Sequence, residues 1–331
     1  MDIINVKNLS KSYKVVKRNS GFWNAIKSFF KREYKIVNAV NGVTFSIKKG
    51  EIVGYIGPNG AGKSTTIKML SGILKPDSGS IMIDGMNPVI DRKKYVKEIG
   101  VVFGQKSQLW WDIPAIESFD LLREIYDIPS DEYNKTLDEL VNLLKIEEII
   151  KLPVRQLSLG ERMKCELVAS LLHNPKILFL DEPTIGLDAV SKVIVRDFIK
   201  KINMDKKVTV ILTSHDMADI ESLAERIIII GNGEKLYDGD ITTIKKKYSN
   251  EKVIEIYYDK LKSLPKIKNC VVVSNENGIV KVKIDSKKIS VSDVTMEYAK
   301  VCEIKDINVI SETIDNIIYK LYKDFEVWEH I

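Results

Sequence analysis

Residues 57–65 read GPNGAGKST, and they directly follow the apolar run IVGYI at 52–56. Gly57 to Ser64 fits the pattern G-x-x-x-x-G-K-S, which binds phosphate when it lies between a strand and a helix. Glycines let successive backbone N–H groups point at phosphate oxygens, and the dipole of the following helix adds positive charge. We expect Lys63 to neutralise the β and γ phosphates and the Ser64 hydroxyl to bind Mg²⁺. The alternative interpretation is a glycine turn that opens a helix.

Four further apolar runs resemble IVGYI and alternate with helical patterns. They are EIGVVF (98–103), KILFL (176–180), VTVIL (208–212) and RIIII (226–230). Runs rich in Val and Ile, without in-out alternation, are typical of strands buried on both faces of a parallel sheet. Polar residues follow four of the five runs: GPNGAGKST, Gly104-Gln105, Asp181-Glu182 and Thr213-Ser214-His215. Because ligands bind beyond the carboxyl ends of such strands, we expect one site there.

The acidic pair and the histidine are candidates for the chemistry of this site. We expect Asp181 to hold Mg²⁺ through its water shell and Glu182 to polarise the attacking water. The alternative for this pair is an acidic turn ahead of Pro183. A lone histidine is usually structural, but His215 follows a strand beside the phosphate loop, and we expect it to act in the site.

In this order the motifs resemble the nucleotide-binding subunit of ATP-binding cassette (ABC) transporters, over about residues 1–240. GPNGAGKST looks like the Walker A loop, Gln105 like the Q-loop glutamine, LSLGE (157–161) like the signature, ILFLDEP (177–183) like Walker B, GLD (186–188) like the D-loop, and His215 like the switch histidine. The resemblance implies that Tyr13 stacks on adenine. It implies that ATP also contacts Gly57, Pro58, Asn59, Gly60, Ala61, Gly62, Lys63, Ser64 and Thr65.

The resemblance also implies the catalytic and metal-binding residues and the cofactor. Catalysis is assigned to Glu182, His215, Lys63 and Gln105, and Mg²⁺ to Ser64, Gln105 and Asp181. In this family two subunits sandwich two ATP molecules, each bound by the Walker motifs of one subunit and the signature of the other.

The signature departs from the commoner LSGGQ sequence of the family. Ser158 and Gly160 match, whereas Leu159 and Glu161 do not. We expect Ser158, Gly160 and Glu161 to face the ATP bound by the second subunit. Ser158-x-x-Glu161 also fits a capping box that opens a helix. Both interpretations can hold, because a capped helix N-terminus aimed at a phosphate is also an anion site.

The predicted fold is α/β, an ABC-type nucleotide-binding domain with a small α+β domain at its C-terminal side. The cassette, residues 1–243, has a mostly parallel phosphate-loop sheet with antiparallel β and helical subdomains, the helical one at about 106–170. Residues 250–331 form the accessory domain, with strands at KVIEIYY, CVVVS, IVKVKID and EIKDINVI and a helix near SETIDNIIYKLYKDF. Trp110 and Trp111 follow Gln105 and either anchor a partner's helix or pack in the cassette's own core.

A basic amphipathic segment at about 17–37 separates Tyr13 from the phosphate loop. Within it, Phe22, Trp23, Ile26, Phe29 and Phe30 recur at the spacing of one helix face. The net charge of +5 is concentrated in residues 17–35, so the rest of the chain is close to neutral and no nucleic-acid partner is indicated. We expect a membrane-proximal helix at 20–35 that aids assembly with a permease or lies at lipid headgroups; the alternative is packing on its own subdomain.

The predicted function is that of an ATP-hydrolysing subunit that pairs with a second copy and drives separate integral membrane permease subunits. The longest wholly apolar runs, such as IIII at 227–230, are far shorter than the roughly 18 residues of a membrane span. We therefore expect a peripheral protein at the cytoplasmic face of the cell membrane, with three free thiols in a reducing compartment. The sequence resembles ABC-2 type exporters, including the viologen-type export group. The alternatives are an importer subunit and a soluble ABC ATPase that acts without a permease.

Overall fold

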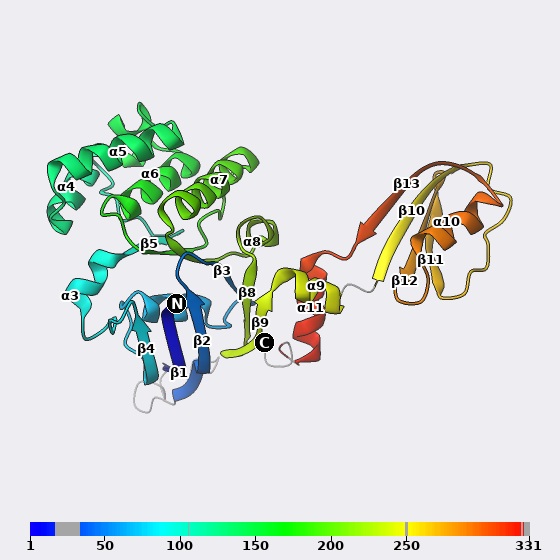
Figure 1. Ribbon diagram of the computed structural model, residues 1–331, viewed down its shortest axis with the longest axis horizontal. Coiled ribbons are helices and arrows are strands. Elements are labelled where there is room, and N and C mark those ends of the chain that lie inside the picture. Colours follow the sequence, from blue (N-terminus) through cyan, green and yellow to red (C-terminus); the bar gives the residue numbers. More distant parts are fainter. Residues whose placement is uncertain (17–33, 105, 249–250, 326, 328–331) are drawn as a thin grey trace, which may run out of the picture. The chain divides into compact units, whose positions relative to one another are not determined.

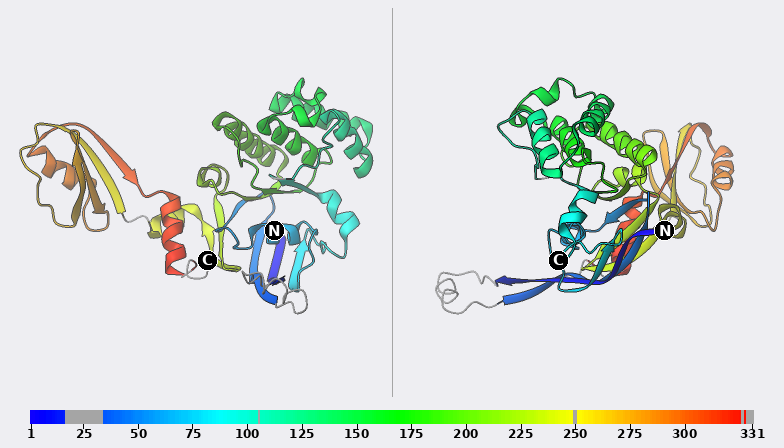
Figure 2. Two further views of the ribbon diagram at one scale, coloured as in Figure 1. Left: turned by 180° about the vertical axis from the view of Figure 1, so that it is seen from behind. Right: turned by 60° about the vertical axis from the view of Figure 1, so that its left-hand side comes forward.

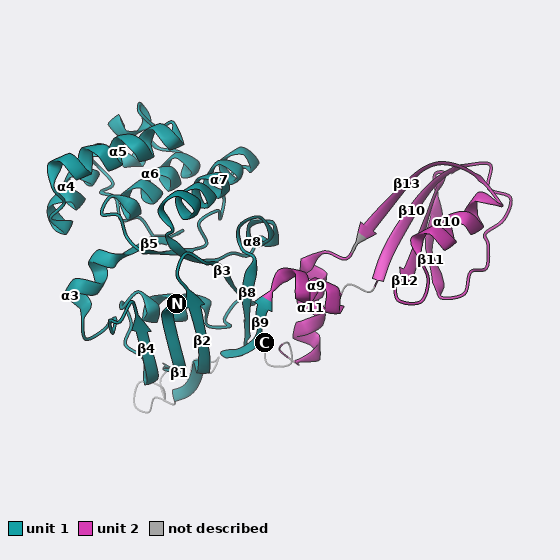
Figure 3. Ribbon diagram, in the orientation of Figure 1, with its two compact units in different colours: residues 1–239 teal, residues 240–331 magenta. Residues whose placement is uncertain are grey.

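The computed structural model describes residues 1–16, 34–104, 106–248, 251–325 and 327 (Figure 1). The chain divides into two compact units, Met1–Gly239 and Asp240–Ile331 (Figure 3). The predicted cassette ends at 243, inside helix α9 (Ile241–Tyr248), which belongs to the second unit.

A six-stranded sheet forms the centre of the first unit, with the order β5-β6-β7-β3-β8-β9. Its strands are β3 (Ile52–Ile56), β5 (Ile99–Phe103), β6 (Ile177–Asp181), β7 (Thr209–Thr213), β8 (Arg226–Gly231) and β9 (Glu234–Asp240). The neighbours β5/β6, β6/β7, β7/β3 and β3/β8 are parallel. The prediction of five parallel strands is therefore confirmed, and it succeeded because burial on both faces demands apolar side chains at nearly every position.

A three-stranded antiparallel sheet, β2-β1-β4, packs beside the parallel sheet. It comprises β1 (Asp2–Val16), β2 (Tyr34–Lys48) and β4 (Ser78–Ile83). One core cluster joins both sheets, including Ile4 and Phe45 from the antiparallel sheet and Tyr55 and Phe179 from the parallel one. The rings of Phe45 and Tyr55 lie 5.8 Å apart between centroids. Burial of this shared apolar surface fixes the first unit as one body.

Strands β1 and β2 form a long hairpin, with Val16 paired to Tyr34 and Tyr13 paired to Val37. The predicted helix at 20–35 is wrong at its last two residues, because Tyr34 and Lys35 continue this antiparallel ladder. Cross-strand pairing, rather than helical spacing, decides their conformation. The rest of that prediction falls on residues 17–33, outside the residues that the structure describes.

The first unit carries α2 (Lys63–Leu70), α3 (Arg92–Tyr95), α4 (Ala115–Tyr126), α5 (Ser130–Leu144), α6 (Leu159–Leu171), α7 (Ala189–Lys206) and α8 (Met217–Leu223). Short 3-10 helices lie at Val96–Glu98, Ile149–Lys151 and Val154–Gln156. Helices α4, α5 and α6 gather away from the antiparallel sheet, within the predicted helical subdomain (Figures 1 and 2). In α5, Tyr133, Leu137, Leu140 and Leu144 are buried along one face, as helical periodicity requires.

Trp110 and Trp111 precede α4 and are not core residues, because their exposed fractions are 43% and 51%. The Trp111 ring lies 5.7 Å from the guanidinium carbon of Arg162 on α6. The alternative that both tryptophans fill the core is therefore wrong, and the partner-helix interpretation stays a prediction.

The second unit contains a four-stranded sheet of order β11-β12-β10-β13, in which every neighbouring pair is antiparallel. Its elements are β10 (Glu251–Asp259), β11 (Cys270–Glu276), β12 (Ile279–Asp285), α10 (Val291–Ala299), β13 (Glu303–Ser311) and α11 (Ile314–Asp324), with α9 before them. The predicted α+β class is confirmed. A separate core joins β10 and β12 to Val294 and Tyr298 of α10.

Among the described residues, the structure contains no helix with the length and hydrophobicity of a membrane span.

Candidate active site

The phosphate loop connects β3 to α2 and depends on glycine for its shape. Gly62 precedes α2 with φ 102°, a conformation that residues with a side chain rarely adopt. A Cβ atom on Gly62 would lie 2.1 Å from the carbonyl oxygen of Ala39. The loop backbone at Gly62 therefore lies so close to β2 that no residue with a side chain fits at this position.

The Lys63 ammonium is buried within this loop. It donates hydrogen bonds to the carbonyl oxygens of Gly57 (2.7 Å) and Pro58 (3.2 Å). Burial lowers the pKa of Lys63, while the nearby carboxylates of Glu182 and Asp181 oppose the shift. A cation held beside a ring of backbone N–H groups is suited to bind phosphate.

Asp181 ends β6, and its carboxylate lies beside the start of α2. Its Oδ1 accepts hydrogen bonds from Thr213 Oγ1 (2.7 Å) and Ser64 Oγ (3.3 Å). Hydroxyl and carboxylate oxygens are the ligands that Mg²⁺ prefers, and it usually keeps several waters and contacts substrate phosphates. Ser64 and Asp181 therefore fit a magnesium site that phosphate oxygens complete. Thr213 follows the apolar run at 208–212, and its hydroxyl at that strand end is the sequence signal for this contact.

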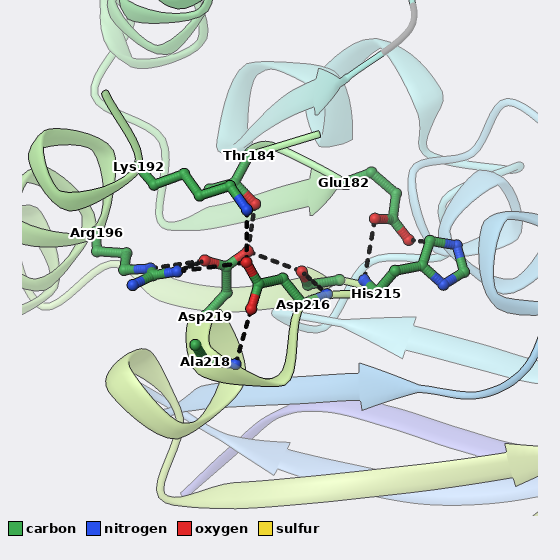
Figure 4. Close-up of polar contacts among 9 residues, drawn as sticks. Glu182, Thr184, Lys192, Arg196, His215, Asp216, Ala218 and Asp219 are labelled. Carbon is green, nitrogen blue, oxygen red and sulfur yellow. Dashed lines mark hydrogen bonds and ion pairs between the residues drawn. The ribbon is translucent and has the colours of Figure 1, made fainter. Parts of the chain in front are cut away.

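Glu182 and His215 lie against each other at the ends of β6 and β7 (Figure 4). The backbone N–H of His215 donates to Glu182 Oε2 at 3.1 Å, and His215 Nε2 lies 3.2 Å from Oε1. Apart from this contact with His215, Oε1 is a buried oxygen without a hydrogen-bond partner among the described residues. Burial raises the pKa of Glu182, against the opposing effect of His215 and Lys63. A half-buried carboxylate with a raised pKa, one of whose oxygens accepts no hydrogen bond from the described residues, is suited to orient water and accept its proton.

A cavity of about 620 Å³ brings these groups together. Of the predicted residues, its walls include Pro58, Asn59, Gly60, Gly62, Lys63, Ser64, Thr65, Asp181, Glu182 and His215; other described wall residues are Ala39, Lys68, Ile73, Phe103, Gly104, Lys106 and Ile185. This volume is in the range of small-molecule and cofactor sites. Gln105 lies outside the described residues, between two wall residues of the cavity.

Two predicted loop residues and Tyr13 do not line the cavity within the described part of the chain. The Gly57 carbonyl accepts a hydrogen bond from Lys63, Ala61 is buried, and Tyr13 lies on β1 with 39% of its surface exposed. Tyr13 pairs with Val37, two residues before the wall residue Ala39. Its contact with adenine stays a prediction.

The signature residues begin α6, and the predicted capping box is confirmed. Glu161 N–H donates to Ser158 Oγ (3.3 Å), and Glu161 Oε2 accepts from the backbone N–H (2.9 Å) and Oγ (2.8 Å) of Ser158. These hydrogen bonds from Ser158 lower the pKa of Glu161. Ser158, Gly160 and Glu161 do not line the cavity of their own chain as described, and their contact with a second subunit's ATP stays a prediction.

A glycine-dependent loop with a buried lysine, at the edge of a parallel sheet beside an Asp-Glu pair, defines a phosphate-loop nucleotide hydrolase. The chain belongs to the ABC transporter family, whose model, described as "ABC transporter", matches residues 40–185.

The similarity extends to named relatives and to solved structures. The chain is 32% identical to the ABC transporter ATP-binding protein NatA of Bacillus subtilis (strain 168), over 70% of this chain and 94% of NatA. It is 30% identical to the Nod factor export ATP-binding protein I of Ralstonia nicotianae, over 71% of this chain and 72% of that protein. It also resembles the dimeric post-hydrolysis structure of the cassette MJ0796 bound to ADP and Pi. That match has a TM-score of 0.60 and 28% identity, over 72% of this chain and 98% of the other. The chain is therefore a nucleotide-binding ATPase subunit of an ABC transporter.

Proposed function

We propose that this subunit binds Mg-ATP, pairs with a second copy around it, and hydrolyses it to drive export through a separate membrane permease. The observation that carries the proposal is the convergence of Lys63, Asp181, Glu182 and His215 on the cavity beside the phosphate loop. The similarity to a Nod factor export ATP-binding protein favours export over import. Pairing is supported by the dimeric state of the similar cassette.

Each residue has a distinct role in the proposed reaction. The Lys63 ammonium exchanges the carbonyl oxygens of Gly57 and Pro58 for phosphate oxygens. Ser64 and Asp181 hold Mg²⁺, which neutralises negative charge on the phosphates. Glu182 orients the attacking water through its free oxygen and accepts a proton from it, while His215 fixes the orientation of that carboxylate.

The proposed assembly places the remaining predicted residues. Tyr13 stacks on adenine, Gln105 reaches the metal, and Ser158, Gly160 and Glu161 contact the ATP held by the second subunit. The complex lies at the cytoplasmic face of the membrane, where the ATPase is a peripheral subunit. No nucleic acid takes part.

Substituting Glu182→Gln tests the catalytic assignment. The variant should bind Mg-ATP normally yet hydrolyse it at least about 100-fold more slowly, the scale for losing one key catalytic group. Measurement of ATP affinity and turnover in the purified complex, with size-exclusion chromatography for pairing, checks this result. Glu117→Gln, which neutralises an exposed acid on α4, is the control. Turnover of the Glu182 variant within about threefold of wild type would remove Glu182 from this role.

Recovery of the tagged chain from detergent-solubilised native membranes tests the permease assignment. We expect a protein with several membrane spans to co-purify in a fixed ratio to the ATPase and to stimulate its turnover. Active ATPase that purifies without such a protein, and whose turnover membranes do not alter, would favour the soluble alternative.

A further inference from the structure

Asp219, in the first turn of α8, has a fully buried carboxylate that connects three segments around the site (Figure 4). Its Oδ2 accepts a hydrogen bond from Ser214 Oγ at 2.8 Å and another from Thr184 Oγ1. Its Oδ1 lies 2.6 Å from Nε and 2.5 Å from Nη2 of Arg196 on α7. One carboxylate thus joins the segment after β6, the segment after β7, and α7.

The two hydroxyl donors are close neighbours of the two catalytic candidates in the chain. Ser214 directly precedes His215, and Thr184 comes two residues after Glu182. A single oxygen atom of Asp219 therefore binds the hydroxyls of residues that lie one position from His215 and two positions from Glu182.

Glu182 needs such support because its backbone is strained. Its φ is 59°, in the left-handed region that residues with a side chain seldom adopt. Its N–H donates to Thr213, to the backbone oxygen at 3.2 Å and to Oγ1 at 3.1 Å, which anchors the preceding side. The bond between Thr184 and Asp219 anchors the following side.

The charge on Asp219 is balanced within the same cluster. Arg196 has 17% of its side-chain surface exposed and also lies 3.7 Å from Asp216. Asp216 in turn binds Lys192 at 2.5 Å and caps α8 by accepting from the N–H of Ala218. Desolvating an ion pair costs as much as the pairing returns in many proteins, so stability alone does not account for this pair.

We propose that the Asp219–Arg196 pair is a positioning device for hydrolysis, which holds Glu182 and His215 in register through Thr184 and Ser214. Asp219 and Arg196 are positioning residues, since neither lines the cavity described here. The inference rests on the proposed function, because it takes Glu182 as the group that acts on the attacking water. It also assigns α7 a part in aligning that group.

The double variant Asp219→Ala/Arg196→Met tests this role without leaving a buried charge unpaired. Removing both charges should keep the melting temperature above that of the single variant Asp219→Ala, because no buried charge is left unpaired, although the hydroxyls of Thr184 and Ser214 lose their acceptor. We expect kcat for ATP hydrolysis to fall at least about tenfold while ATP affinity and KM stay within about threefold. The single variant Asp219→Ala should have both a lower melting temperature and a lower kcat than wild type. Adding Arg196→Met should raise the melting temperature again but should not restore kcat.

The matched control is Asp238→Asn, which breaks a partly buried ion pair with Arg226 (2.7 Å) away from the catalytic candidates. It should leave kcat within about twofold of wild type. If the single variant at Asp219 fails to fold, Thr184→Val removes one hydroxyl bond to Asp219 without touching the other contacts of the cluster and should lower kcat in the same direction.

Comparison with Glu182→Gln separates the positioning role of the Asp219–Arg196 pair from the catalytic role of Glu182. A double variant with wild-type kcat, beside an inactive Glu182→Gln, would show that the buried pair only stabilises the fold. Parallel losses of kcat and ATP affinity in the double variant would also overturn positioning. Wild-type turnover by Glu182→Gln would instead overturn the catalytic assignment itself.

Discussion

At the scale of single residues, the site balances one buried cation against two carboxylates. Lys63 is held by carbonyl oxygens of its own loop, and burial opposes its charge. Glu182 is half-buried, and its Oε1 has no hydrogen-bond partner among the described residues. In the proposed function the phosphate would supply acceptors for Lys63, and the attacking water would supply a donor for Glu182.

Tyr13 is the predicted residue whose role depends most on its ring. Stacking of an aromatic side chain on a base is worth about 1–3 kcal/mol, so Tyr13→Ala should weaken ATP binding at least about fivefold. Tyr13→Phe and Tyr13→Trp should restore it. Titration with ATP checks the series, with Tyr34→Ala, an exposed tyrosine at the start of β2, as the control. Equal losses for all three Tyr13 substitutions would indicate packing rather than stacking.

At the scale of elements, two glycines of the phosphate loop differ in how much space surrounds them. Gly60 and Gly62 both have positive φ, of 82° and 102°. A Cβ atom at Gly60 meets no heavy atom within 4 Å, whereas one at Gly62 meets the backbone of Ala39. Gly62→Ala should therefore lower the melting temperature of the ATP-free protein more than Gly60→Ala, which should cost only the backbone strain of about 1–2 kcal/mol in folding. Calorimetry of both variants with and without ATP checks the order; the reverse order would contradict it.

The hairpin of β1 and β2 makes the hypothesis about residues 20–35 testable. Because Val16 and Tyr34 are partners, a short Gly-Ser bridge in place of residues 17–33 can close the hairpin without disturbing Tyr13. We propose that this segment is membrane-proximal, so the variant should bind ATP as wild type does yet be recovered less with membranes at physiological salt. Replacing Lys27, Lys31 and Arg32 by Gln separates the contribution of positive charge to membrane recovery from that of apolar contact. Loss of folding, or unchanged membrane recovery, would refute the hypothesis.

At the scale of the whole molecule, the two units have separate cores, and the described lining of the cavity comes from the first unit. Every described residue that lines the cavity belongs to Met1–Gly239, and the core around Ile254 and Tyr298 lies within the second unit. A chain truncated after Gly239 should therefore fold and bind ATP within about threefold of the full chain. Circular dichroism and ATP titration check this expectation. Aggregation of the truncated chain, or loss of nucleotide binding, would show that the units depend on each other.

The sequence by itself determined the five parallel strands, the phosphate loop, the acidic pair and the histidine. Each is encoded by residues adjacent in the chain: an unbroken apolar run, a glycine pattern, or polar residues at a strand end. The capping box of Ser158 and Glu161 is equally local, and it too is confirmed. The four strands of the second unit were predictable for the same reason.

Only the tertiary structure decided which distant residues meet. Tyr34 and Lys35 became strand because β1 pairs with them, against their helical spacing. Asp219, Arg196 and Thr184 had no local signal, since their contacts join α8, α7 and the segment after β6 across 23 and 35 positions. The strained backbone of Glu182 is likewise held by residues from other segments. Local patterns reflect burial and periodicity, whereas the orientation of a catalytic group depends on long-range contacts that no short stretch of sequence encodes.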